Sequence, residues 1–258
     1  MPALTAVNAE RYQLSDSALI ARANEQMQNE GVCVLPQFIT ASAVRAMVSE
    51  CDTLAPLAHR SAPRRNPYLT KAPSAGDGTA ATVLHDSLEV LAYDHFPASS
   101  VLRQLYESEA LLEFIRACLG VEQLYRYADP FGALNVSIMR DGDVLDWHFD
   151  MTDFVVSIAL QSSSHGGDFE NASRIRDAGE EAIADLLSGD RRRVRVEPMS
   201  AGTLMLFNGR RSMHRVSPIV GRVPRYVALL AYDTKPGTDS TDELKLSRYG
   251  RLPTKSRT

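Results

Sequence analysis

The sequence predicts an α+β protein, mainly β, whose core is a double-stranded β-helix (a cupin-like jelly roll) with N-terminal helices packed outside. Two observations lead to this prediction. Helical periodicity dominates residues 1–120, whereas residues 121–235 contain seven or eight short β-rich runs separated by Gly, Asp, Asn and Ser turns. A chain of 258 residues can form one such domain with a large core. We therefore expect a single domain over residues 1–258, with a C-terminal tail at 236–258.

Three segments of the first half have apolar residues at helical spacing. The first is capped by Ser15 or Asp16 and stops at Gly31, the second begins after Thr40, and the third covers residues 98–120. Residues 31–39 alternate in polarity and predict a strand. Residues 55–86 show no periodicity and predict a long loop, a feature that often covers a binding site.

The second half is a series of short strands with one helix, expected near residues 179–187. The predicted strands are 123–128, 133–140, 153–161, 167–171, 192–198, 202–207, 214–220 and 224–232. Strands of this length and spacing are typical of a sandwich or a jelly-roll barrel.

Composition and charge argue against several classes of protein. Hydrophobic residues make up 44% of the chain, charged residues make up 23%, and the net charge is −4. These values favour a globular protein and argue against binding to nucleic acid or to an anionic membrane. The sequence has no apolar run long enough to span a membrane and no secretory leader, so we expect a cytoplasmic protein. The cysteines at 33, 51 and 118 are scattered, which argues against a disulfide framework or a thiolate metal site.

One pair of residues suggests metal chemistry. His148 and Asp150 lie two positions apart just before an apolar strand, and alternate residues of an extended chain point to the same side. His214 lies at the head of a later strand. Two imidazoles and one carboxylate on one face form the facial triad of non-haem iron(II) sites, which leaves positions open for a co-substrate and oxygen.

A cation follows the second histidine. Arg225 opens the strand at 224–232, and a guanidinium can bind the far carboxylate of a keto acid such as 2-oxoglutarate with two hydrogen bonds. The alternative for Arg225 is an ordinary surface ion pair. The alternative for a single histidine at a strand end is a structural hydrogen bond.

The runs DWHFDMTDFVVSIALQSSSHGGDFE and AGTLMLFNGRRSMHRVSPIVGRVPRYVALLAYDTKPG, with YRYADPFGALNV before them and YGR at 249–251, carry a family resemblance. They resemble the iron(II)/2-oxoglutarate oxygenases that act on free amino acids, a family that includes hydroxylases and lysine-type radical halogenases. The resemblance covers roughly residues 90–251. It implies Fe(II), 2-oxoglutarate and O₂ as cofactors, with His148, Asp150 and His214 as metal ligands.

The resemblance also bears on the reaction. The halogenating members have glycine in place of the metal carboxylate, which frees a position for chloride. This chain keeps Asp150, so we expect hydroxylation of an unactivated C–H bond in a small molecule, a free amino acid or a derivative of one. Desaturation and ring closure by the same iron chemistry stay open.

Further residues are candidates for binding. Asn135 lies on a predicted strand and is expected to bind 2-oxoglutarate, unless it only satisfies the backbone. Four others are expected to bind the substrate, with a turn or a solvated surface as the alternative: Asp146, Asp153, Tyr68 and Arg176. Arg60 in the long loop is another candidate clamp for a carboxylate, and Trp147 is expected to pack behind the metal ligands.

Two other functional classes compete with this reading. A cupin-like hydrolase or isomerase would use the same ligands with zinc or manganese and without 2-oxoglutarate, and Arg225 argues against it. A non-catalytic binding module would not need three intact ligands. The only partner we expect is a small-molecule substrate, and both a monomer and a homodimer are compatible with the sequence.

Overall fold

The computed structural model describes residues 3–61, 67 and 86–254, and the description below refers to these residues. The helices are α1 (Ser17–Asn29), α2 (Ala41–Leu54), α3 (Val101–Glu107), α4 (Glu109–Leu119), α5 (Glu180–Ser188) and α6 (Asp242–Tyr249). The strands are β1 (Val32–Leu35), β2 (His59–Ser61), β3 (Leu88–Leu91), β4 (Tyr125–Arg126), β5 (Leu134–Met139), β6 (Leu145–His148), β7 (Val155–Gln161), β8 (Phe169–Ala172), β9 (Arg195–Glu197), β10 (Leu204–Phe207), β11 (Met213–Val216), β12 (Arg225–Leu230) and β13 (Tyr232–Asp233). Short 3₁₀ turns lie at Ala3–Ala6, Ala55–Leu57, Tyr93–His95 and Ile175–Ala178.

Two antiparallel sheets face each other. Among the described strands, the larger sheet has the order β1-β10-β7-β12-β5-β3-β2 and the smaller sheet has the order β6-β11-β8-β9, while β4 and β13 form a two-stranded ribbon. From β5 to β12 the chain crosses repeatedly from one sheet to the other. This winding is that of a double-stranded β-helix and confirms the predicted fold.

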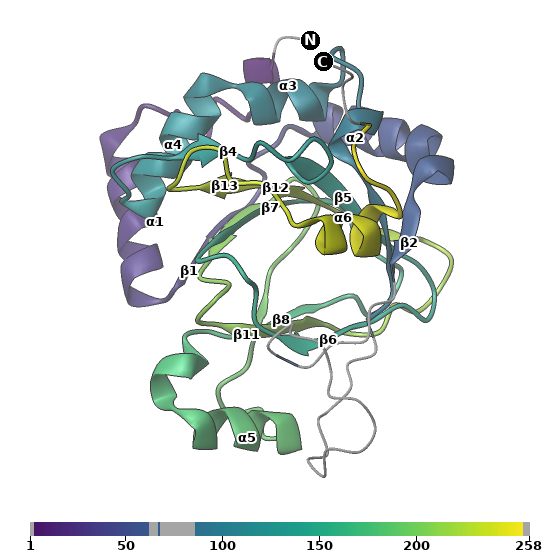
Figure 1. Ribbon diagram of the computed structural model, residues 1–258. Helices are drawn as coiled ribbons and strands as arrows, with labels where there is room; N and C mark the ends of the chain where they lie inside the picture. The colour runs from purple at the N-terminus through teal and green to yellow at the C-terminus, as the bar shows by residue number, and fades with distance from the viewer. Residues whose placement is uncertain (1–2, 62–66, 68–85, 255–258) are drawn as a thin grey trace.

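The helices lie outside the sheets, as predicted. Helices α1 to α4 cover the outer face of the larger sheet, and α5 lies beyond the smaller sheet (Figure 1). The largest apolar cluster fills the layer between the larger sheet and these helices, and it includes Tyr226, Ala228 and Leu230 of β12. Because side chains alternate along a strand, Arg225, Val227 and Leu229 must point the other way, towards the smaller sheet.

The same alternation holds in the neighbouring strands. Val136 and Ile138 of β5, like Val156 and Ile158 of β7, belong to the helix-side cluster. The residues between them therefore face the space between the sheets: Asn135, Ser137 and Met139 of β5, and Val155, Ser157 and Ala159 of β7. The two sheets thus enclose a chamber, the space between their inner faces.

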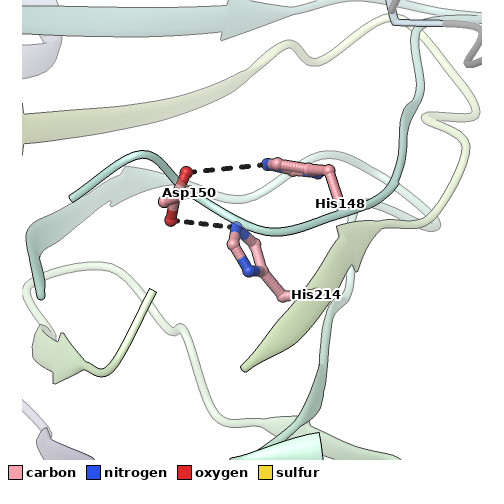
Figure 2. Close-up of side chains that lie close together, drawn as sticks. All are labelled: His148, Asp150 and His214. Atoms are coloured by element: carbon pink, nitrogen blue, oxygen red, sulfur yellow. Dashed lines mark ion pairs between the residues drawn. The ribbon is translucent and has the colours of Figure 1, made fainter. Parts of the chain in front are cut away.

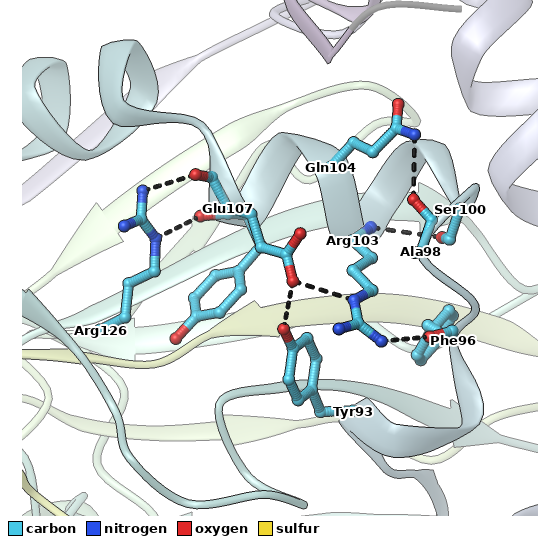
Figure 3. A network of polar contacts seen from close by, with 9 residues as sticks. Tyr93, Phe96, Ala98, Ser100, Arg103, Gln104, Glu107 and Arg126 are labelled. Atoms are coloured by element: carbon cyan, nitrogen blue, oxygen red, sulfur yellow. Dashed lines mark hydrogen bonds and ion pairs between the residues drawn. The ribbon is translucent and has the colours of Figure 1, made fainter.

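The predicted helix at 98–120 is wrong in one respect, because it is two helices. Arg126 donates to the carbonyl oxygens of Tyr106 and Glu107, each at 2.9 Å, and so satisfies the end of α3 from outside (Figure 3). Ser108 then caps α4 by accepting from the Leu111 N–H at 3.4 Å. The break depends on an arginine of a distant strand, so helical periodicity alone does not reveal it.

Polar contacts fix α3 against the segment before it. Glu107 accepts hydrogen bonds from the Tyr93 hydroxyl and from Arg103 (Figure 3). The Arg103 guanidinium also donates to the Phe96 carbonyl at 2.9 Å and lies over the Tyr93 ring, 4.6 Å from its centroid. These contacts hold α3 against the short turn that follows β3.

Several boundaries differ from the predictions. Strand β2 lies inside the segment predicted to be a loop, whereas β3 begins two residues after it. The position of β2 is set by its pairing with β3, a contact that local sequence does not encode. Helix α6 lies in the predicted tail, where Thr241 caps it by accepting from Leu244 N–H. The predicted caps at Asp16 and Thr40 are confirmed.

The three cysteines are fully buried. Cys33 and Cys118 pack in the helix-side cluster, which confirms that they act as small hydrophobic residues. Burial raises the pKa of each of the three thiols to about 12. Within the part of the chain that the structure describes, no helix has the length and apolarity to cross a membrane.

Candidate metal centre

Three predicted ligands converge at one end of the chamber. His148 ends β6, Asp150 follows two residues later, and His214 lies on β11, where its Cα pairs with that of His148. One ligand atom from each residue lies within 4.8 Å of the other two. Figure 2 shows the carboxylate of Asp150 facing both imidazoles: Oδ1 lies 3.8 Å from His148 Nε2 and Oδ2 lies 3.3 Å from His214 Nε2.

Backbone carbonyls orient both imidazoles. Nδ1 of His148 lies 2.7 Å from the carbonyl oxygen of Asp146, and Nδ1 of His214 lies 3.1 Å from that of Ser212. A carbonyl only accepts, so Nδ1 carries the proton and donates, and the lone pair is on Nε2. This arrangement is how proteins prepare histidine as a metal ligand.

Both histidines are shielded from solvent. His148 and His214 are 5% and 3% exposed. Burial, followed by the neighbouring His214, lowers the pKa of His148. Rings of Phe207 and Phe169 lie 4.9 Å and 5.4 Å from the His214 ring centroid. Two imidazoles and a carboxylate fit iron(II).

Arg225 lies at the start of β12 and points into the chamber from the larger sheet. It is only 6% exposed, and among the described residues no carboxylate forms an ion pair with it. Burial lowers the pKa of Arg225 to about 10, although Asp168 acts in the opposite direction, so the guanidinium is charged at neutral pH. A buried cation without an ion-pair partner is costly, and an anion bound in the chamber would relieve that cost.

Two polar side chains line the chamber close to the same strand. The Cα atoms of Asn135 on β5 and Ser157 on β7 both pair with that of Leu229 on β12, one from each side. Asn135 Oδ1 and Ser157 Oγ are buried, and neither has a hydrogen-bond partner among the described residues. Buried polar groups are usually satisfied, so these two side chains are available to a polar ligand in the chamber. With the small side chains of Ser137 and Ala159 beside them, the chamber fits a compact dicarboxylate such as 2-oxoglutarate.

Sequence reasoning overlooked Ser157 and Asn171. Asn171 lies on β8 with its Cα paired to that of His214, and its buried Oδ1 also lacks a partner. The available signal was a polar residue at an inward position of an otherwise apolar strand. The sequence alone does not show which positions of a strand face inward, so this signal can be used only after the structure is known.

Two predicted substrate residues flank the metal ligands. Asp146 contributes its carbonyl to His148, and its N–H donates to Asp86 Oδ1 at 2.9 Å. Asp153 is paired instead with Arg210, whose Nε lies 2.5 Å from Asp153 Oδ1, and both side chains are largely exposed. Contact of either residue with a substrate stays a prediction.

Arg176, Trp147 and Arg60 are not among the residues that form the metal centre. Arg176 is exposed and lies over the Phe149 ring, 4.1 Å from its centroid, in the cluster beneath α5 on the outer side of the smaller sheet. Trp147 belongs to this same cluster, which confirms its place behind the ligands. Arg60 pairs with the buried Asp143, a structural contact that argues against the carboxylate clamp predicted for it. Tyr68 lies outside the described residues.

Comparisons with known proteins agree with this geometry. A model of the family described as halogenase D (HalD) matches residues 15–245. No curated protein sequence matches the chain.

Solved structures resemble the fold at low sequence identity. An oxidoreductase of the 2OG-Fe(II) oxygenase family from Burkholderia pseudomallei is 16% identical, with 85% of this chain and 92% of that chain covered and a TM-score of 0.55. EctD from S. alaskensis, solved with 2-oxoglutarate and 5-hydroxyectoine, is 18% identical, with 89% and 80% covered and a TM-score of 0.57. SnoN, an alpha-ketoglutarate-dependent epimerase from nogalamycin biosynthesis, is 14% identical, with 84% of each chain covered and a TM-score of 0.58. At such identities the likeness shows a shared fold.

Proposed function

This chain belongs to the halogenase D family of iron(II)- and 2-oxoglutarate-dependent oxygenases, and we propose that it hydroxylates an unactivated C–H bond of a small molecule. The substrate class that we propose is a free amino acid or a derivative of one, following the family resemblance. The observation that carries hydroxylation is Asp150, whose carboxylate faces both imidazoles, with Oδ1 3.8 Å from His148 Nε2 and Oδ2 3.3 Å from His214 Nε2. A carboxylate in this place occupies the position that a halide would need.

Each chamber residue has a distinct task in this proposal. His148 and His214 present their Nε2 atoms, and Asp150 provides one negative charge, so iron(II) is held by a facial set of ligands. Arg225 binds the far carboxylate of 2-oxoglutarate through its guanidinium. The buried Ser157 hydroxyl can donate a hydrogen bond to an oxygen of the same molecule, and Asn135 can do so through its Nδ2 amide group.

The chamber walls exclude water. Phe169, Phe207 and Val216 form part of an apolar cluster on the inner faces of the two sheets. An apolar surface that excludes water strengthens the ion pair between Arg225 and the 2-oxoglutarate carboxylate, and it protects a reactive centre from solvent. When bound, iron with 2-oxoglutarate and O₂ supplies the oxidant for C–H cleavage, and the 2-oxoglutarate leaves as succinate and carbon dioxide. The protein's part is to aim one C–H bond at that centre.

Other outcomes use the same residues. Desaturation and ring closure need the same triad and the same co-substrate, and the epimerase SnoN shares the fold. A hydrolase or isomerase that works without 2-oxoglutarate would have no use for a buried, unpaired Arg225.

The deciding experiment is a panel of free amino acids under turnover with iron(II), 2-oxoglutarate and O₂. We expect one amino acid to stimulate succinate formation and to gain one oxygen atom by mass. A product that has lost two hydrogens would identify desaturation or ring closure, and product formation without 2-oxoglutarate would contradict the oxygenase proposal.

A further inference from the structure

The turn that joins β10 to β11 touches the metal carboxylate directly. Residues 208–212 form this turn, with Gly209 and Arg210 near its start, and His214 follows it on β11. The backbone N–H of Asp150 donates to the Gly209 carbonyl oxygen at 3.1 Å. Two of the three metal ligands therefore depend on one short segment.

Gly209 leaves no room for a side chain. A Cβ built on Gly209 would lie 2.6 Å from Asp150 Oδ2, 2.9 Å from Asp150 Cβ and 3.0 Å from a methyl carbon of Val155. The first two distances are shorter than those that real Cβ atoms show. Gly209 does not have a positive φ, so the backbone conformation itself does not call for glycine. The reason for glycine at this position is the close approach of Asp150.

The atom that a Cβ at residue 209 would approach most closely is Asp150 Oδ2, an oxygen of the metal-binding carboxylate. Asp150 Oδ2 also lies 3.3 Å from His214 Nε2, on the ligand side of the imidazole. Any side chain at 209 would push the carboxylate away from the position that it shares with the two histidines. The far end of Asp150 would yield first, because it rotates about single bonds while the backbone of the turn is held.

We propose that Gly209 is a positioning residue for Asp150. Because residue 209 has no side chain, the Asp150 carboxylate has the room it needs to bind the metal together with His148 and His214. The inference deepens the proposed function, since it rests on Asp150 as a metal ligand. The requirement for glycine at 209 is specific to a chain that carries a carboxylate at 150. It should disappear when residue 150 has no side chain.

Arg210, the next residue in the turn, holds the residues that follow Asp150 in the chain. Its guanidinium donates to the Met151 carbonyl and to the Asp153 carboxylate, and so ties the residues after Asp150 to the same turn. Arg210 and Asp153 are largely exposed, with side chains 53% and 76% accessible. We therefore assign Arg210 a smaller contribution than that of Gly209.

Metal affinity tests the proposal without a substrate. Co²⁺ is titrated into the apoprotein in the presence of excess 2-oxoglutarate and is followed by its visible absorption. Gly209→Ala should weaken Co²⁺ binding about 10- to 100-fold, the usual effect of losing a group that orients a ligand. Arg210→Ala should weaken it less, and Arg211→Ala, the matched control from the same turn, should leave it unchanged because Arg211 pairs with Asp177 instead.

The decisive comparison repeats Gly209→Ala in an Asp150→Gly background. We expect no further loss of Co²⁺ affinity there, because the group that collides with the new methyl is gone. An equal loss in both backgrounds, or no loss with Asp150 present, would overturn the proposal. If Gly209→Ala unfolds the protein, rescue of the melting temperature by Asp150→Gly supports the collision, and failure to rescue overturns it. Because no substrate is used, these results are independent of whether hydroxylation is the reaction.

Discussion

His148 and His214, distant in sequence, are direct cross-strand partners, with ring centroids 4.3 Å apart and planes inclined at 57°. Their strands belong to the smaller sheet, and Asp150 lies two residues beyond the end of β6 at His148. The metal centre is therefore built on paired strands, and only the carboxylate comes from a loop. Such a platform holds ligand geometry better than loops alone would.

Removal of any one ligand should abolish turnover while the fold persists. His148→Ala, Asp150→Ala and His214→Ala each remove a metal-binding atom, but the three side chains line the chamber and do not belong to the apolar clusters. Succinate formation and circular dichroism measured side by side test this prediction. A variant with near-normal turnover would show that its residue is not a ligand.

Loss of Arg225 should affect 2-oxoglutarate more than the substrate. Removing one partner of a desolvated charge pair typically costs about 2–5 kcal/mol, so Arg225→Met should raise the apparent KM for 2-oxoglutarate by roughly 30-fold or more. The KM for the primary substrate should change much less. An unchanged 2-oxoglutarate requirement would move the role to Arg222, because Arg215 already forms a bidentate pair with Glu170.

Asp150 should decide between hydroxylation and halogenation. The unmodified protein should produce no chlorinated product even in high chloride, because the carboxylate occupies the halide position. Asp150→Gly opens that position, and we expect it to be mostly inactive, with at most a trace of chlorinated product visible by mass spectrometry. Chlorination by the unmodified protein would contradict the assignment of Asp150 as a ligand.

The buried Asp143 should make stability depend on pH. Burial alone would raise the pKa of Asp143, but hydrogen bonds from Arg60, the Arg140 N–H and Ser87 lower it below the usual value. The stabilisation is therefore complete above the unfolded-state pKa of about 4 and is lost as pH falls through the folded-state pKa.

The matched variant is Asp143→Asn. We expect it to reduce the free energy of unfolding by about 1–3 kcal/mol at pH 7, as measured by urea denaturation. The difference from the unmodified protein should shrink towards pH 3. A difference that stays constant over this range would mean that the charge of Asp143 is not what stabilises the fold.

The three thiols should be unreactive in the native state. The thiolate is the reactive form, and burial raises the pKa of Cys33, Cys51 and Cys118 to about 12. A chromogenic disulfide reagent at pH 8 should detect no native thiol and all three thiols in guanidinium chloride. A thiol that reacts quickly without denaturant would contradict the burial of that cysteine.

The sequence by itself determined the metal ligands and the fold class. His148 and Asp150 are two residues apart, so an extended backbone was expected to bring them to one side, although β6 ends at His148 and Asp150 lies just beyond it. The β-rich runs after residue 121 were enough to predict a jelly roll. Capping by Asp16 and Thr40 was likewise local and was predicted correctly.

Tertiary structure alone decided the rest, because those features depend on register between strands far apart in the chain. The place of Ser157 beside Leu229 follows from the pairing of β7 with β12. The break at Ser108 depends on Arg126 reaching the end of α3. The sequence does not distinguish Gly209 from other glycines in turns. Only the packed structure shows that the absence of a side chain at this position makes room for Asp150. A one-dimensional pattern records which residues are apolar, but it does not record which atoms meet across the chamber.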